Sequence, residues 1–103
     1  MIKHINSIEE FEKEIQNGKV LIDFYASWCG PCRMLSPVIE ELEEEGKLNN
    51  INVIKVDVDQ LPELASRYNV FSIPNLFLLD NGQIINNQLG YQNKNQLLAF
   101  LNK

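Results

Sequence analysis

Hydrophobic positions in the second quarter of the chain repeat with the period of a helix. They stand at i, i+3, i+4 and i+7, the mark of one buried helix face: Leu35, Val38, Ile39 and Leu42. We expect a helix over 31–45, since proline is favoured in a first turn and Gly46 can end the helix. Pro37 lies inside it, and the lost hydrogen bond predicts a kink over 33–37.

The segment before this helix is apolar at almost every position. Residues 20–26 read Val-Leu-Ile-Asp-Phe-Tyr-Ala, which is typical of a central strand covered on both faces. Asp23 is the one charged residue in the run. The residues between this expected strand and the expected helix, 27–30, therefore form a strand-to-helix turn.

The other patterns predict three strands and three helices. Ser7 with Glu10, and Asn93 with Gln96, match helix-capping patterns, and Asn81-Gly82 between strand-like runs is a strong hairpin signal. The expected elements are a helix over 8–17, a strand over 51–58, a short helix over 62–68, strands over 75–79 and 83–89, and a helix after residue 93.

The order of these elements predicts an α/β fold. Two strands joined by a helix form a parallel, right-handed βαβ unit, and the C-terminal hairpin adds antiparallel strands. We therefore expect a central mixed β-sheet flanked by helices on both faces. At 103 residues, the chain is expected to be a single domain over 1–103.

Charge and hydropathy exclude several classes of partner. The net charge of −5 repels a phosphate backbone, so we expect no nucleic-acid binding. The longest apolar runs are far shorter than the roughly 20 residues of a membrane span, and the first residues lack the apolar stretch of an export signal. We expect a cytoplasmic monomer that does not bind membranes.

Both cysteines lie in Trp28-Cys29-Gly30-Pro31-Cys32, at the expected strand-to-helix turn. A structural zinc site needs four ligands, and the chain offers no third cysteine and one histidine, His4, so we expect no metal. A structural disulfide closing so small a loop would contribute only roughly 2 kcal/mol. A redox-active dithiol is favoured, because a helix N-terminus stabilises the thiolate that attacks disulfides.

The two thiols are expected to differ in role. Cys29 is nearer the turn, and we expect it to be exposed and to attack a substrate disulfide. Cys32 is one turn further along the helix and is expected to be more buried, so that it resolves the mixed disulfide by attacking Cys29. Gly30 and Pro31 restrain the turn between them.

Asp23 has two compatible interpretations. A carboxylate inside an apolar strand is costly unless paired or protonated, so its pKa should be raised, and it could move a proton to or from Cys32. Alternatively, it is a structural carboxylate held by a charged neighbour. Lys55, on the expected adjacent strand, is the candidate for that neighbour.

With these residues assembled, the chain resembles the thioredoxin family along its whole length. The resemblance rests on the segment from Asp23 to Cys32, on Pro37, and on Lys55-Val56-Asp57-Val58-Asp59, Ile73-Pro74, Asn81-Gly82 and Gly90. It implies the thioredoxin fold, Cys29 as nucleophile, Cys32 as resolving thiol, and Asp23 with Lys55 as a buried proton-handling pair. It also implies a cis peptide at Ile73-Pro74, although the residues alone favour a trans strand-entry proline.

The resemblance further implies a docking surface for extended substrate segments beside the dithiol. We define this docking surface by seven residues: Trp28, Gly30, Pro31, Ser72, Ile73, Pro74 and Gly90. Trp28 could equally pack over the site. Phe71, Ser72 and Asn75 depart from the commonest family pattern, and these changes bear on partner choice more than on reaction type.

The function implied by the resemblance is protein-disulfide reduction in electron transport and cell redox homeostasis. No cofactor would be bound, because electrons would come from NADPH through thioredoxin reductase. Ribonucleotide reductase, methionine sulfoxide reductase and peroxiredoxins are the implied clients. Two alternatives stay open: an oxidant or isomerase of the same fold, which a reduction potential would distinguish, and a binding module whose dithiol is incidental.

Overall fold

The apolar run expected to be a central strand forms β2, Lys19–Tyr25, in the computed structural model, which describes residues 2–103. Strand β2 pairs in parallel with β3, Ile51–Asp57, and antiparallel with β4, Asn75–Asp80. Its side chains alternate between two buried clusters, since Leu21 enters one and Ile22 enters the other. The strand is therefore covered on both faces, as its composition predicts.

The sheet has the order β1-β3-β2-β4-β5 and is mixed, as expected. Strand β5, Gln83–Leu89, is joined to β4 by Asn81 and Gly82, whose φ angles of 49° and 83° suit a tight two-residue hairpin turn. Strand β1, Ile2–His4, pairs with β3 at the other edge. The sequence did not predict β1, because three residues are too few to show a period.

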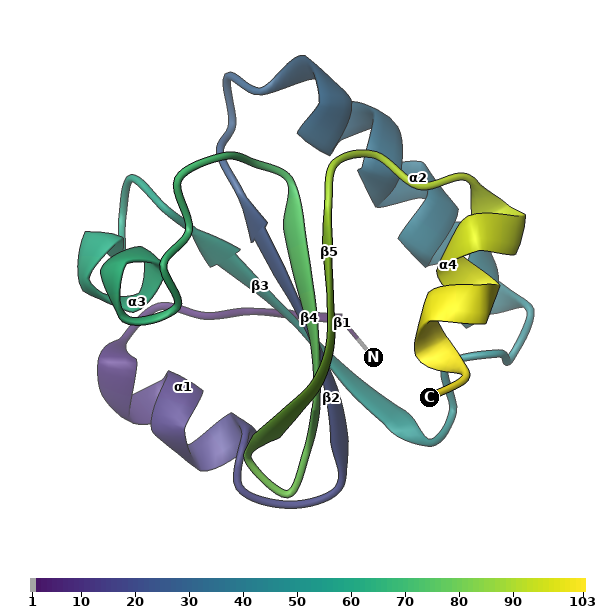
Figure 1. The fold of residues 1–103 in the computed structure, drawn as a ribbon, viewed down its shortest axis with the longest axis horizontal. Coiled ribbons are helices and arrows are strands. Elements are labelled where there is room, and N and C mark those ends of the chain that lie inside the picture. The colour runs from purple at the N-terminus through teal and green to yellow at the C-terminus, as the bar shows by residue number, and fades with distance from the viewer. Residues whose placement is uncertain (1) are drawn as a thin grey trace.

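Helices cover both faces of the sheet (Figure 1). On one face, α2 (Gly30–Glu44) and α4 (Lys94–Leu101) enclose a core that includes Leu35, Ile39 and Leu42 of the expected helical stripe. On the other, α1 (Ile8–Glu14) and α3 (Pro62–Arg67) enclose a second core. The predicted α/β architecture is confirmed.

Several element ends differ from those expected. Helix α1 ends three residues early, and Gly18 takes a φ of 71° in the turn that follows. Helix α2 begins one residue early, at Gly30, because Cys29 acts as its N-cap, and it continues through Pro37 without interruption. The two expected caps are present: Ser7 accepts from the Glu10 N–H, and Asn93 forms a capping box with Gln96.

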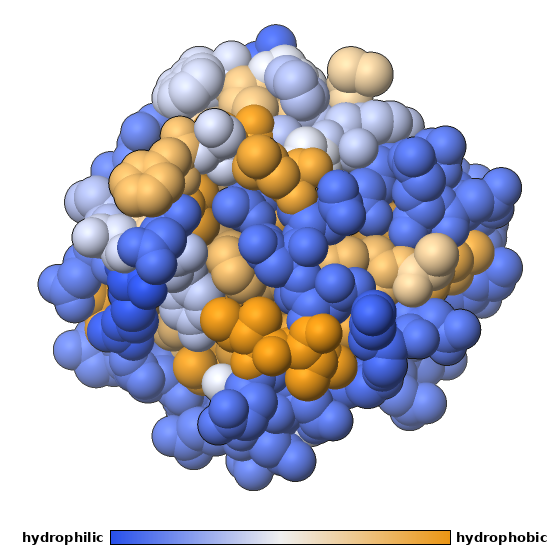
Figure 2. Space-filling view, in the orientation of Figure 1, coloured by the Kyte–Doolittle hydropathy of each residue, from blue (hydrophilic) through white to orange (hydrophobic). Residues whose placement is uncertain are grey.

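The surface is mostly hydrophilic, with separate apolar areas. Figure 2 shows them on the face that carries the exposed edge strand β5 in Figure 1. Six large apolar side chains are exposed in the described chain: Trp28, Met34, Phe71, Ile84, Leu89 and Tyr91. Within residues 2–103, the helices are all too short or too polar to span a bilayer.

Candidate active site

The site lies where β2 passes into α2. The backbone N–H of Cys29 donates to the Ala26 carbonyl at 3.2 Å, which closes a turn after the strand. Cys29 then caps the helix with its sulfur, because its Sγ accepts a hydrogen bond from the Cys32 N–H at 3.2 Å. Pro31 fits this first turn, where a backbone N–H would have no helical partner. The local sequence thus brings Cys29 to the positive end of the helix.

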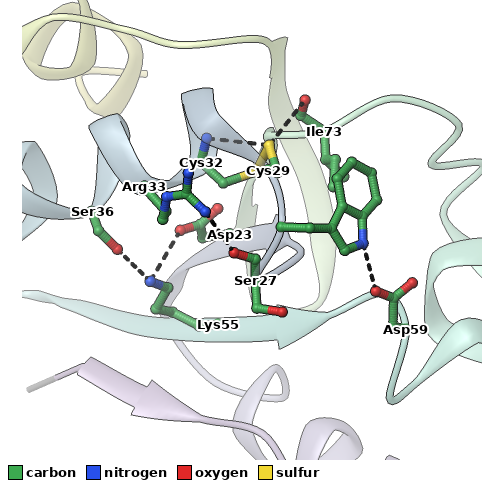
Figure 3. The surroundings of a disulfide bond; sticks show 10 residues. Asp23, Ser27, Cys29, Cys32, Arg33, Ser36, Lys55, Asp59 and Ile73 are labelled. Carbon is green, nitrogen blue, oxygen red and sulfur yellow. Dashed lines mark hydrogen bonds and ion pairs between the residues drawn. A yellow bond between two sulfur atoms is a disulfide. The ribbon is translucent and has the colours of Figure 1, made fainter.

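Cys29 and Cys32 form a disulfide across this first turn, with their Cα atoms 5.2 Å apart (Figure 3). Each cysteine is only 4% exposed, so the expectation that Cys29 would be exposed and Cys32 more buried is wrong. Cys29 is buried because its side chain turns inward as the cap and lies in a small cluster with Ala26 and Ile73. Burial as a whole therefore does not distinguish the two cysteines in the oxidised form.

The loop before β4 lies against the dithiol. The Ile73-Pro74 peptide is cis, as the resemblance implied, and the Ile73 carbonyl oxygen lies 3.8 Å from Cys29 Sγ. The Pro74 carbonyl accepts a hydrogen bond from the Gly90 N–H at 2.8 Å, which ties the end of β5 to the same loop. Three residues of the expected docking surface are thus connected to one another and reach Cys29.

The other members of the docking surface lie at the start of α2 and in the loop before Ile73. Trp28 is 67% exposed, and its indole Nε1 donates to Asp59 Oδ2 at 2.8 Å, so its ring is held at the surface. Gly30 is half-buried, and Pro31 and Ser72 are exposed. The sequence assigns Asp59 no role, because residues 28 and 59 meet only through the fold.

Asp23 lies directly opposite Lys55 in the parallel pairing of β2 with β3. Its side chain is 1% exposed, and its Oδ2 lies 3.9 Å from Lys55 Nζ. Burial raises the pKa of Asp23 from 3.8 to about 6, and the positive charge of Lys55 opposes part of that rise. Both predictions for this carboxyl, the raised pKa and the charged neighbour, are confirmed.

Lys55 has two further neighbours that the sequence reading missed. Its Nζ donates to Ser36 Oγ at 2.6 Å and lies 4.7 Å from the centre of the Tyr25 ring. The signal for Ser36 was available, because it follows Cys32 by four residues and so shares its face of α2. Tyr25 is next but one to Asp23, on the same face of β2.

A surface hollow of about 250 Å³ opens beside this group. Its walls include Cys32 and Lys55, so these two side chains face one space that solvent can enter. Arg33 also lines it, and its guanidinium donates to the Ser27 carbonyl at 3.1 Å. Within residues 2–103, no group of three or more His, Cys, Asp or Glu side chains is placed to hold a metal ion.

Taken together, the geometry suits thiol-disulfide exchange. The family model described as Thioredoxin matches residues 2–103. The chain is 42% identical to a thioredoxin of Listeria monocytogenes, covering 100% of this chain and 98% of the relative, and 41% identical to one of Bacillus subtilis, covering 92% and 90%. A solved thioredoxin of Malassezia sympodialis superposes with a TM-score of 0.88 at 31% identity, covering 98% of this chain and 88% of that one.

Proposed function

Because this chain belongs to the thioredoxin family and is a thiol-disulfide oxidoreductase with protein-disulfide reductase activity, we propose that Cys29 attacks the substrate and that Cys32 resolves the intermediate. One observation carries this assignment: the two cysteines form a disulfide across the first turn of α2, with Cys29 as the helix cap. A cap sulfur receives a backbone N–H and the positive end of the helix dipole, both of which stabilise a thiolate.

The reaction then proceeds in two exchanges. The Cys29 thiolate attacks one sulfur of the substrate disulfide, which forms a mixed disulfide and releases the other substrate sulfur as a thiolate that takes up a proton. Cys32 loses its proton and attacks Cys29 Sγ, which forms the Cys29–Cys32 disulfide and releases the second substrate thiolate. Two electrons pass to the substrate, and the dithiol is oxidised.

Asp23 is proposed to take the proton that Cys32 loses in the second exchange. A base is effective when its pKa lies near the working pH, and burial raises the pKa of Asp23 to about 6. Lys55, 3.9 Å away, is proposed to steady the carboxylate once the proton has left. The hollow that Cys32 and Lys55 both line would give the proton a way to solvent.

The docking surface is proposed to receive an extended segment of the substrate. Ile73 and Pro74 would present loop backbone beside Cys29, and Gly90, bonded to Pro74, would leave room at the end of β5. Trp28 would supply an exposed ring on a fixed anchor, Asp59, while Gly30, Pro31 and Ser72 would complete the contact.

In the cell, we propose a cytoplasmic, monomeric carrier in electron transport and redox homeostasis. Electrons from NADPH would reach it through thioredoxin reductase, with no cofactor bound to this chain. Ribonucleotide reductase, methionine sulfoxide reductase and peroxiredoxins are the proposed clients.

Reduction of insulin disulfides, driven by NADPH and thioredoxin reductase, tests this function. We expect the wild type to turn over and Cys29→Ser to lose turnover, while Ser66→Ala, a change on the exposed face of α3, serves as the matched control. A reduction potential near −270 mV fits a reductant, whereas one near −120 mV would favour an oxidant. Full activity in a Cys29→Ser, Cys32→Ser double variant would favour a binding module instead.

A further inference from the structure

Ser36 is the nearest hydrogen-bonding partner of the Lys55 ammonium. Lys55 Nζ lies 2.6 Å from Ser36 Oγ but 3.9 Å from Asp23 Oδ2, beyond hydrogen-bond distance (Figure 3). We propose that Ser36 is a positioning residue, whose hydroxyl holds the Lys55 ammonium at this distance and so limits how closely the lysine charge approaches Asp23. The effect on turnover rests on the proton-handling role proposed above for Asp23.

Three elements bring these side chains together. Helix α2 supplies Ser36 one turn after Cys32, on the helix face toward the sheet, and β3 and β2 supply Lys55 and Asp23 as direct partners in register. Ser36 and Lys55 also line both neighbouring hollows, one beside Cys32 and one beside His4. Their hydrogen bond therefore borders two spaces that solvent can enter.

The Ser36 hydroxyl competes with the Asp23 carboxylate for the Lys55 ammonium. Asp23 is almost fully buried, and within residues 2–103 neither of its carboxylate oxygens accepts a hydrogen bond. The Lys55 side chain is 12% exposed, and its flexible stem allows the ammonium to move. Without Ser36 Oγ, the ammonium would lose a charge-assisted hydrogen bond, and the carboxylate of Asp23, 3.9 Å away and without a hydrogen-bond partner in the described chain, would attract it.

Other charged and titratable groups surround Lys55 and Asp23. These groups are the same in the wild type and in Ser36→Ala. The pKa of Tyr25 is raised, chiefly by burial and also by the charges of Asp57 and Asp23. Glu40 and His4 line one hollow with Lys55, and Arg33 and Cys32 line the other. Because Ser36 carries no charge, its replacement by alanine changes none of these charges and acts on Asp23 through the position of Lys55.

The direct test is an NMR titration of the Asp23 side-chain carboxyl carbon in the oxidised protein, where the cysteines do not titrate. In Ser36→Ala, we expect the pKa of Asp23 to fall by about half a unit or more, because the ammonium approaches the carboxylate. Ser36→Thr keeps the hydroxyl and should retain the wild-type pKa. Ser66→Ala is the matched helical control. A pKa in Ser36→Ala that is unchanged or raised would overturn the proposal.

A second background shows whether the effect passes through Lys55. In Lys55→Met, adding Ser36→Ala should produce no further fall in the pKa of Asp23, because there is no ammonium to move. A fall of the same size in that background would overturn the proposal.

Turnover separates this inference from the proposed function. In Ser36→Ala, the acidic limb of the pH–rate profile for the second exchange should move to lower pH, together with the pKa of Asp23. In Ser36→Thr, the acidic limb should lie where it does in the wild type. If the pKa falls while the profile stays in place, Ser36 keeps its positioning role and Asp23 loses its proposed role in turnover.

Discussion

The backbone N–H of Cys32 donates a hydrogen bond to Cys29 Sγ at 3.2 Å, so one cysteine caps the helix turn that holds the other. The same contact serves two needs of a dithiol. It directs a backbone dipole at the sulfur proposed to attack, and it keeps the second cysteine one turn away, with the Cα atoms 5.2 Å apart.

Replacing Cys32 with serine should trap the reaction halfway. Cys29 can still attack a substrate disulfide, but no second thiol is present to release the product, so a mixed disulfide through Cys29 should accumulate. Mass spectrometry of the adduct formed with a disulfide-containing protein locates the bond. Cys29→Ser is the matched control and should accumulate far less adduct. An adduct that forms equally well in Cys29→Ser would contradict the assigned roles.

Replacing Asp23 with asparagine should stabilise the oxidised protein in a pH-dependent way. Because the folded state raises the pKa of Asp23 from 3.8 to about 6, the folded protein binds this proton more tightly than the unfolded chain does. Ionisation therefore costs stability progressively as pH rises from about 4 to about 6, and the full cost persists above that range.

Asp23→Asn removes that cost. The free energy of unfolding should rise by about 2–3 kcal/mol at pH 8, since one pKa unit corresponds to about 1.4 kcal/mol, and change little at pH 4. Urea unfolding at both pH values measures it. Glu44→Gln, at an exposed carboxylate near the end of α2, is the control and should change neither value appreciably. A gain of equal size at pH 4 would contradict the buried-charge explanation.

The same substitution should slow the second exchange. Asparagine cannot accept the proton from Cys32, and loss of a general base typically lowers the rate about 100-fold or more. Water in the neighbouring hollow can accept part of the protons instead, which would reduce the effect. Rapid-quench measurement of the decay of the mixed disulfide isolates this step. Unchanged decay would reduce Asp23 to a structural carboxylate.

Asp59 should matter for protein substrates through Trp28. Asp59→Ala removes the acceptor of the indole hydrogen bond, and we expect kcat/KM for insulin to fall about two- to fivefold, in line with the roughly 1 kcal/mol of such a bond, while reduction of a small disulfide changes little. Trp28 is the single tryptophan of the sequence, so its fluorescence anisotropy should fall when the ring is released. Equal losses of kcat/KM for insulin and for the small disulfide would point to damage at the dithiol instead. Glu63→Gln is the control and should change neither value appreciably.

Phe71 should influence which substrates bind without stabilising the fold. Its side chain is 91% exposed, two residues before Ile73, so Phe71→Ala should change the free energy of unfolding by less than about 0.5 kcal/mol. We expect kcat/KM to fall for substrates with apolar residues near the disulfide and to stay constant for polar ones. Ile84→Ala, at an exposed apolar residue of β5, is the control. A uniform loss across substrates would exclude a role in selection.

Much of the fold was predictable because it depends on local patterns. The 3.6-residue period of Leu35, Ile39 and Leu42 identified α2, and Asn81-Gly82 identified the hairpin. Strand β1 was missed because Ile2–His4 is too short to show a period, and its pairing with β3 joins residues about fifty positions apart. The start of α2 was misplaced by one residue because Cys29 is an uncommon N-cap.

By itself, the sequence determined the elements, the two thiols at a strand-to-helix turn, and a carboxyl that had to be buried at Asp23, because each follows from the identity and spacing of neighbouring residues. Only the tertiary structure decided that Cys29 is as buried as Cys32, that Trp28 is held by Asp59, and that Lys55 is bonded to Ser36 more closely than to Asp23. Those facts depend on distances between segments far apart in the chain, which no local pattern encodes.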